Sequence, residues 1–135
     1  MRILAIDLGD VRSGLAMGES TTGTIEPLRV VEARTPEQRL TILAGVVEEF
    51  GPELILVGLP LNMDGTEGSQ AKAARTFADE LTACTDIPVN MQDERLTSFE
   101  ADQQLKGSGR SRKGRKQIQD ALAAAELIRD YLATT

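Results

Sequence analysis

The chain of 135 residues contains no histidine and no tryptophan, and it has a single cysteine. Without histidine, neither general catalysis by an imidazole nor a His-ligated metal site is available. Cys84 alone cannot form an intramolecular disulfide, which agrees with a reducing compartment. No run of about eighteen apolar residues could cross a bilayer, and the N-terminus lacks the apolar core of a signal peptide. We therefore expect a cytoplasmic protein without a membrane partner.

Aromatic side chains are also scarce, being limited to Phe50, Phe77, Phe99 and Tyr131. RNA modules that stack bases on aromatic rings need a platform of such side chains, so the composition argues against that class. The shares of hydrophobic residues (41%) and charged residues (27%) are ordinary for a globular protein. The length predicts one domain, covering residues 1–135.

The net charge of −6 is unevenly distributed along the chain. Residues 106–116 carry six basic side chains and no acid, which leaves −12 on the remainder. This basic segment is compatible with a solvated, Gly- and Ser-rich loop. It is equally compatible with an arm that neutralises the phosphates of a nucleic acid.

The hydrophobic pattern predicts an α/β fold. Strands are expected over residues 3–6, 13–18, 24–31, 53–57 and 87–91, and helices over 35–50, from Ser69 to Leu81, from 97 to 106 and over 115–132. Pro27 favours an edge strand or a bulge for the third strand. The order predicts a mixed five-stranded sheet flanked by helices, in which strands one to three are antiparallel and strands four and five are parallel.

Three acidic residues stand out because they follow or interrupt apolar segments. Asp7 ends the first strand just before Gly9, Glu94 follows the fifth strand, and Asp120 lies among apolar residues of the last helix. Two of them also have an ordinary structural interpretation: Asp7 could cap its own turn, and Asp120 could interact with the N-terminal end of its helix. Asp93, beside Glu94, could be a second ligand or a neighbour that faces solvent. Because consecutive side chains of a strand point in opposite directions, we favour Glu94.

Taken together, these acids predict a metal site. Ligands of such sheets gather beyond the carboxyl ends of the parallel strands, where Asp7 and Glu94 are expected. Carboxylates without His or Cys suit Mg²⁺ or Mn²⁺ better than zinc. Two such ions could orient and activate water for attack on a phosphodiester and stabilise the leaving oxygen.

Several motifs resemble the YqgF/RuvX family in order and spacing. They are Asp7-x-Gly9-x-x-Arg12-x-Gly14-x-Ala16, Val57-Gly-Leu-Pro-Leu-Asn-Met-Asp-Gly-Thr66, Asp93-Glu-Arg-Leu-Thr-Ser98 and the last helix with Asp120. The resemblance implies a ribonuclease H-like fold of the Holliday-junction resolvase branch. It also implies a metal-dependent endonuclease that matures the 5′ end of the 16S ribosomal RNA precursor. The sequence departs from the family at Ile118-Gln119-Asp120, where an Ile-Asp pair is expected.

Site residues follow from the resemblance by position. Asp7, Glu94 and Asp120 would be the catalytic, metal-holding acids. Arg12 and Arg95 would hold phosphate or brace the site, although Arg95 could equally serve a structural salt bridge. Further substrate contacts are expected from the loop after the fourth strand and from the basic segment: Asn62, Asp64, Thr66, Arg110, Arg112, Lys113, Arg115 and Lys116.

The expected partner is a nucleic acid, either RNA or branched DNA, with ribosomal precursor particles as a further partner. The chain would act as a monomer or a weak homodimer. A Holliday junction resolvase would need a two-fold dimer, for which the sequence shows no interface. A nucleotide-binding ATPase of the actin and sugar-kinase type would need two related domains. A non-catalytic RNA-binding assembly factor would keep the fold without cleaving.

Overall fold

The structure is a computed structural model that describes residues 1–94 and 112–134, without the side chains of residues 112–118. Its elements are β1 (Arg2–Asp7), β2 (Arg12–Glu19), β3 (Thr24–Glu32), α1 (Pro36–Phe50), β4 (Leu54–Leu59), α2 (Ser69–Cys84), β5 (Val89–Asp93) and α4 (Arg112–Ala133). The expected helix beginning near residue 97 lies outside the described residues.

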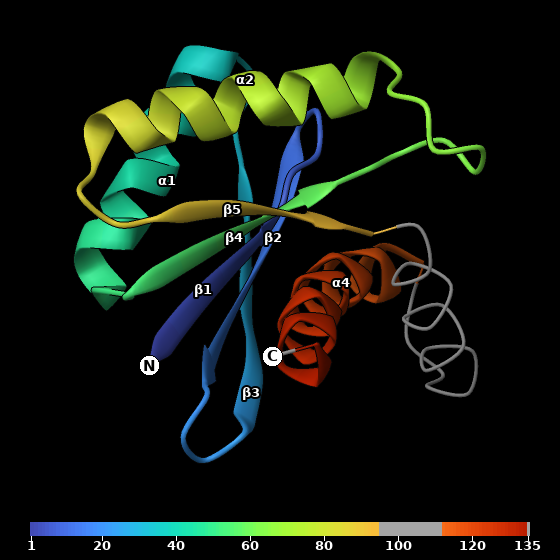
Figure 1. The fold of residues 1–135 in the computed structure, drawn as a ribbon. Helices are drawn as coiled ribbons and strands as arrows, with labels where there is room; N and C mark the ends of the chain where they lie inside the picture. Colours follow the sequence, from blue (N-terminus) through green and yellow to red (C-terminus); the bar gives the residue numbers. More distant parts are fainter. Residues whose placement is uncertain (95–111, 135) are drawn as a thin grey trace.

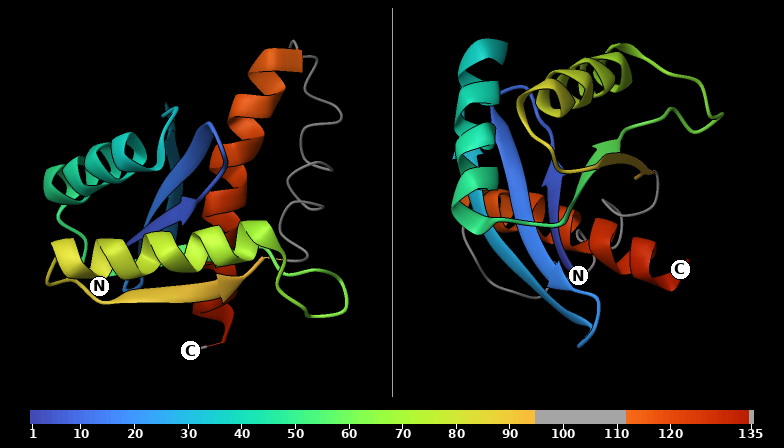
Figure 2. Two further views of the ribbon diagram at one scale, coloured as in Figure 1. Left: turned by 90° about the horizontal axis from the view of Figure 1, so that it is seen from above. Right: turned by 60° about the vertical axis from the view of Figure 1, so that its left-hand side comes forward.

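The five strands form one mixed sheet in the order β3-β2-β1-β4-β5. Strand β2 runs antiparallel to both β1 and β3, whereas β4 runs parallel to β1 and to β5. Helices α1 and α2 cover one face of this sheet and α4 covers the other, giving three layers (Figures 1 and 2). The predicted sheet is therefore confirmed. None of the described helices combines the length and the apolar composition needed to cross a membrane.

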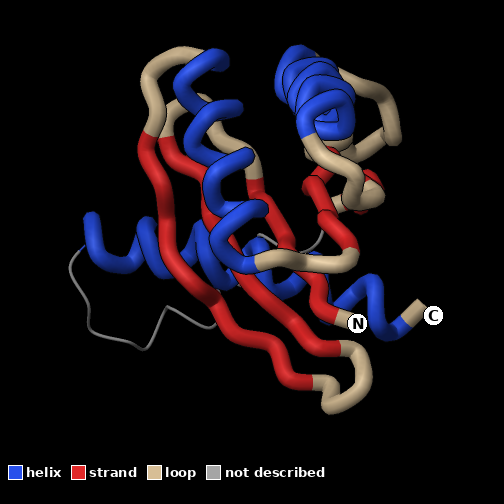
Figure 3. Tube along the Cα trace, turned by 90° about the vertical axis from the view of Figure 1, so that its left-hand side faces the viewer, coloured by secondary structure: helices blue, strands red, loops and turns tan. Residues whose placement is uncertain are grey.

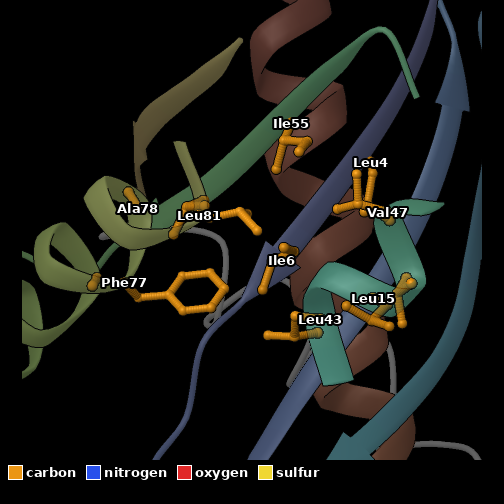
Figure 4. Close-up of a cluster of buried hydrophobic side chains, with 12 residues drawn as sticks. Leu4, Ile6, Leu15, Leu43, Val47, Ile55, Phe77, Ala78 and Leu81 are labelled. Carbon is orange, nitrogen blue, oxygen red and sulfur yellow. The ribbon is translucent and has the colours of Figure 1, made fainter. Parts of the chain in front are cut away.

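Alternating side chains of β1 belong to the two separate halves of the core. Leu4 and Ile6 pack against α1 and α2, while Ile3 and Ala5 pack against α4. Figure 4 shows the first half, in which Leu43 of α1 and Phe77 of α2 meet the sheet. Because side chains alternate along a strand, the next odd-numbered residue, Asp7, belongs to the α4 face.

The start and end of α1 agree with the sequence signals. The Thr35 side-chain oxygen accepts a hydrogen bond from the Gln38 amide at 3.1 Å, as expected for an N-cap. The Gln38 side chain in turn accepts from the amide of Arg34 at 2.8 Å. Gly51 ends the helix in the left-handed region, with a φ of 55°. In Figure 3, α1 lies in front of the strands and α4 lies behind them.

Several predicted boundaries are wrong by two or three residues. Strand β4 continues to Leu59 and β5 is shifted to Val89–Asp93, because Leu59 pairs with Asp93 and extends the parallel register. Helix α2 takes Gly68 as its N-cap, without a side-chain hydrogen bond, so that Ser69 is its first residue instead of its cap. Helix α4 begins at Arg112 because Arg and Lys have a good helix propensity.

Strand β3 shows both features that Pro27 predicted. It lies at the edge of the sheet, where a missing amide donor is tolerated. Its pairing with β2 also shifts between Leu15 and Ala16, which are opposite Arg29 and Pro27. This shift makes a β-bulge at Leu28.

Candidate active site

The carboxyl groups of Asp7 and Glu94 contact each other, with Glu94 as the hydrogen-bond donor. Asp7 is the last residue of β1, and Glu94 directly follows β5. The Glu94 amide donates to the Leu59 carbonyl at 3.3 Å, which carries the pairing of β5 with β4 one residue further. The sheet therefore brings together two acids that are separated by most of the chain.

Strand β4 lies between these two acids, and Gly58 is what lets them meet. Ile6 pairs with Val57, so Asp7 and Gly58 are the next neighbours along the two strands. A Cβ atom at Gly58 would overlap with the Glu94 carboxyl group. Glu94 thus reaches Asp7 through the space that the missing side chain leaves. In the sequence, Gly58 is part of a family motif, and nothing there indicates this role.

A second glycine flanks Asp7 on its other side. Gly14 of β2 is the register partner of Asp7, and a Cβ atom there would overlap with the Asp120 carbonyl. The backbone of α4 therefore lies directly on β2 at this point. This close approach brings Asp120 near enough to raise the pKa of Asp7 electrostatically. All three predicted acids consequently lie near the carboxyl ends of the parallel strands.

The side chain of Asp120 has a cationic partner. Arg12 Nε lies 3.3 Å from Asp120 Oδ2, and both side chains are about three quarters buried, with exposures of 24% and 25%. The pair borders an open hollow of about 600 Å³ that is lined by Gly9, Asp10, Val11, Arg12, Glu32, Arg34, Gln70 and Asp120. Arg12, predicted to hold phosphate, therefore lies beside Asp120 and lines the hollow next to the three acids.

Both acids have raised pKa values, and burial is the largest cause for each. Burial is the main cause of the rise in the pKa of Asp7 to about 6, with Asp120 adding repulsion and the hydrogen bond from Glu94 opposing it. Burial and the charge of Asp7 raise the pKa of Glu94 to about 9, and Asp93 adds to the effect. Without a cation, the pair is most stable when Glu94 is protonated and donates a hydrogen bond to the ionised Asp7.

This pair fits a hard divalent cation in part. Its donors are oxygens only, and the repulsion between them would be relieved by a positive charge. Within residues 1–94 and 112–134, no three Asp, Glu, Cys or His side chains come close enough to form a complete metal cage. Mg²⁺ is commonly bound by one or two carboxylates together with water and substrate phosphate. Asp7 and Glu94 would hold the ion, and Asp120 lies nearby but faces Arg12.

Arg39 is a residue that the sequence analysis missed. From α1, its Nη1 donates to the Gly9 carbonyl at 3.0 Å, two residues beyond Asp7. Its guanidinium lies 5.8 Å from the centre of the Phe77 ring on α2. A Cβ at Gly9 would overlap with the Arg12 carbonyl, so this turn is tight and Arg39 fixes its geometry. No local sequence signal marks Arg39, since its partners are distant in the chain.

The loop after β4 forms its own network of hydrogen bonds. Thr66 Oγ1 and its amide both donate to Asp64 Oδ1, at 2.6 and 3.0 Å, and Asn62 Nδ2 donates to Thr66 Oγ1 at 2.9 Å. Gly65 completes the turn with a φ of 86°. The polar side chains of Asn62, Asp64 and Thr66 therefore stabilise this turn. Their contact with substrate stays a prediction.

The remaining predicted site residues are only partly described. Arg95 and Arg110 lie outside the described residues. The backbone of the other four predicted basic residues belongs to the first turns of α4: Arg112, Lys113, Arg115 and Lys116. Their roles stay predictions.

Comparisons with known proteins cover almost the whole chain. The family model described as "RuvX: Holliday junction resolvase" matches residues 1–134. A protein of Anaeromyxobacter sp. (strain Fw109-5), named "Putative pre-16S rRNA nuclease", is 44% identical over 132 residues, which are 98% of this chain and 96% of the relative.

Two solved structures share the fold. The Holliday junction resolvase of fowlpox virus aligns with a TM-score of 0.66 over 100% of both chains, at 12% identity. RuvC of T. thermophilus, in complex with a Holliday junction substrate, aligns with a TM-score of 0.59 over 99% of this chain and 96% of RuvC, at 18% identity. These likenesses confirm the ribonuclease H-like fold. The match of the family model over residues 1–134 and the 44% identity to the relative from Anaeromyxobacter show that this chain belongs to the RuvX family.

Proposed function

We propose that this chain is a divalent-metal-dependent endonuclease that cleaves the 16S ribosomal RNA precursor near its 5′ end. The observation that carries this proposal is the contact of Asp7 with Glu94, beside Asp120, at the carboxyl ends of the parallel strands. The name of the relative from Anaeromyxobacter, "Putative pre-16S rRNA nuclease", supports the substrate. Such a nuclease would work in the cytoplasm, on naked RNA or on ribosomal precursor particles.

The residues of the site have separate tasks in this proposal. Asp7 and Glu94 hold Mg²⁺ or Mn²⁺, and Asp120 supplies a further carboxylate at the edge of the site. When bound, the ion supplies a Lewis acid that activates water and stabilises charge on the phosphodiester. Arg12 borders the hollow, where its guanidinium can hold a phosphate oxygen. Partial burial of the two acids reduces their contact with bulk water and strengthens their attraction for a cation.

A cleavage assay tests the proposal directly. Precursor 16S rRNA and a four-way DNA junction are incubated in parallel with Mg²⁺ or Mn²⁺, and the products are mapped. We expect cleavage of the RNA near the mature 5′ end, and we expect Asp7→Asn and Glu94→Gln to abolish it. Asp79→Asn, which neutralises an exposed acid on α2, is the matched control and should cleave normally. Cleavage at the wild-type rate by both site variants would refute the site.

Holliday junction resolution is the second candidate, because the description of the family model and the two resolvase structures favour it. Symmetric cleavage of two strands requires a two-fold dimer. Cutting of the DNA junction in the parallel assay, together with a dimer on the junction in sedimentation, would support this function. A strict monomer on the junction would exclude it and leave the RNA nuclease.

Calorimetry separates the nuclease from the other classes. Binding of millimolar Mn²⁺ by the wild type, lost in Asp7→Asn, supports a metal-dependent nuclease. ATP binding would favour the actin and sugar-kinase class. RNA binding without Mn²⁺ binding would indicate a non-catalytic assembly factor.

A further inference from the structure

Arg12 forms an ion pair with Asp120, one of the three acids of the site. Asp120 lies close enough to affect Asp7 electrostatically, yet its Oδ2 faces Arg12 Nε at 3.3 Å. In the described residues, the acids do not form a complete cage while this pair is present. The guanidinium therefore provides Asp120 with the positive charge that a bound cation would otherwise provide.

The position of Arg12 follows from the pleat of β2. Arg12 precedes Gly14 by two residues, so both belong to the same face of the strand, and α4 lies on that face at Gly14. The same guanidinium borders the hollow in front of the site. A phosphate entering this hollow would compete with Asp120 for Arg12, since guanidinium binds phosphate and carboxylate oxygens alike.

We propose that Arg12 exchanges partners on substrate binding, leaving Asp120 for the phosphodiester and thereby freeing Asp120 to complete the cation site. Arg12 is thus a positioning residue for Asp120 in the free protein and a phosphate ligand in the complex. This inference rests on the proposed function, because it assumes a divalent cation on Asp7 and Glu94. It also predicts an order of binding: the site gains its full affinity for the cation only when a phosphodiester is present.

The exchange is energetically accessible. Both side chains keep about a quarter of their surface in contact with solvent, so the pair is neither deeply buried nor strongly desolvated. An anionic phosphate replaces one negative partner of Arg12 by another, so the guanidinium is never left alone. Asp120 likewise exchanges one cation for another, which keeps the charge balanced throughout.

Cation affinity in the absence of nucleic acid tests the inference. Mn²⁺ binding is measured by calorimetry for the wild type, Arg12→Ala and Arg34→Ala at one pH and ionic strength. We expect Arg12→Ala to bind Mn²⁺ roughly fivefold more tightly or better, because Asp120 is released. Arg34→Ala removes the same charge from the lining of the same hollow and is expected to change the affinity little.

A double-mutant cycle separates release of Asp120 from simple removal of positive charge. In an Asp120→Asn background, Arg12→Ala should no longer tighten Mn²⁺ binding. An equal gain in both backgrounds would mean that Arg12 acts only through its charge, and the exchange would be refuted.

The second half of the exchange is tested with dimethyl phosphate, a small phosphodiester anion. It should tighten Mn²⁺ binding to the wild type, with sodium chloride of equal ionic strength as the control, and should have no such effect on Arg12→Ala. Unchanged Mn²⁺ affinity in Arg12→Ala would overturn the inference while leaving the nuclease proposal intact. Absence of Mn²⁺ binding in every form would overturn both.

Discussion

Glu94 reaches Asp7 across the intervening strand β4, passing over Gly58, which has no side chain. The contact joins the carboxyl ends of two strands that are not neighbours in the sheet. Its geometry therefore depends on the order β1-β4-β5 and on one glycine. The electrostatic cost of placing the two acids together depends on the same arrangement, and both can be measured.

The stability of the metal-free protein should fall as the pH rises. The pKa values of Asp7 and Glu94 are raised from ordinary values of 3.8 and 4.5 to about 6 and about 9. At a pH between the ordinary and the raised pKa of each group, the folded state holds more protons than the unfolded chain. A higher pH therefore favours unfolding. We expect a loss of roughly 1–2 kcal/mol per pH unit from pH 5 to pH 8, measured by urea unfolding in the presence of a chelator.

Asp7→Asn should flatten this pH dependence. The substitution removes the charge that raises the pKa of Glu94, together with one of the two titrating groups. The variant should therefore be more stable than the wild type at pH 8 without metal, and less responsive to added Mn²⁺. An equal pH slope in the two proteins would show that the acids do not interact.

Gly58→Ala should damage the site with a limited effect on the fold. The added methyl group overlaps with the Glu94 carboxyl, which must then move away from Asp7. We expect a loss of about 1–3 kcal/mol in the free energy of unfolding, together with weakened Mn²⁺ binding. Gly45→Ala on the open surface of α1 is the matched control and should stabilise the protein by roughly 0.5–1 kcal/mol. Normal Mn²⁺ binding by Gly58→Ala would contradict the proposed crossing.

Arg39→Ala should loosen the turn that follows Asp7. It removes the charged hydrogen bond to the Gly9 carbonyl, for which we expect a loss of about 1.5–3 kcal/mol in unfolding free energy. Arg29→Ala is a close control, because Arg29 also lies over a ring, 5.5 Å from the centre of Phe50, but pairs with an exposed glutamate. That control should cost only about 0–1 kcal/mol. Equal losses in the two variants would leave Arg39 without a special role at the turn.

Glu126→Leu should stabilise the protein. Glu126 is only 2% exposed in the α4 half of the core. One carboxylate oxygen pairs with Arg129, while Oε2 has no hydrogen-bond partner among the described residues. Replacing a buried, incompletely paired carboxylate by an apolar group of similar size is expected to add about 1–4 kcal/mol, measured by chemical unfolding. Destabilisation by this substitution would contradict the expectation.

The basic segment should contribute to binding through phosphate contacts. Neutralising its basic residues should weaken RNA binding. The negative slope of log affinity against log salt should become less steep by about 0.7–0.9 for each lost contact. Those residues are Arg110, Arg112, Lys113, Arg115 and Lys116. The readout is fluorescence anisotropy over a series of salt concentrations. An unchanged slope would leave the segment as a solvated surface.

The sequence by itself determined the elements and the class of fold. Local signals are sufficient for this, because an apolar run such as Ile3 to Ile6 can be stable only between two covering layers. The cap at Thr35 and the stop at Gly51 are likewise encoded within a few residues. The absence of histidine excluded imidazole catalysis and His-ligated metal sites, and the motifs identified the family.

Only the tertiary structure decided how the acids are placed. The meeting of Asp7 with Glu94, the role of Gly58 and the partner of Asp120 all depend on the order and register of the strands, and on how closely α4 approaches β2. Such contacts join segments that are far apart in sequence, so no local propensity encodes them. A glycine in particular carries no signal of what will occupy the space above it, and that space is decided by packing.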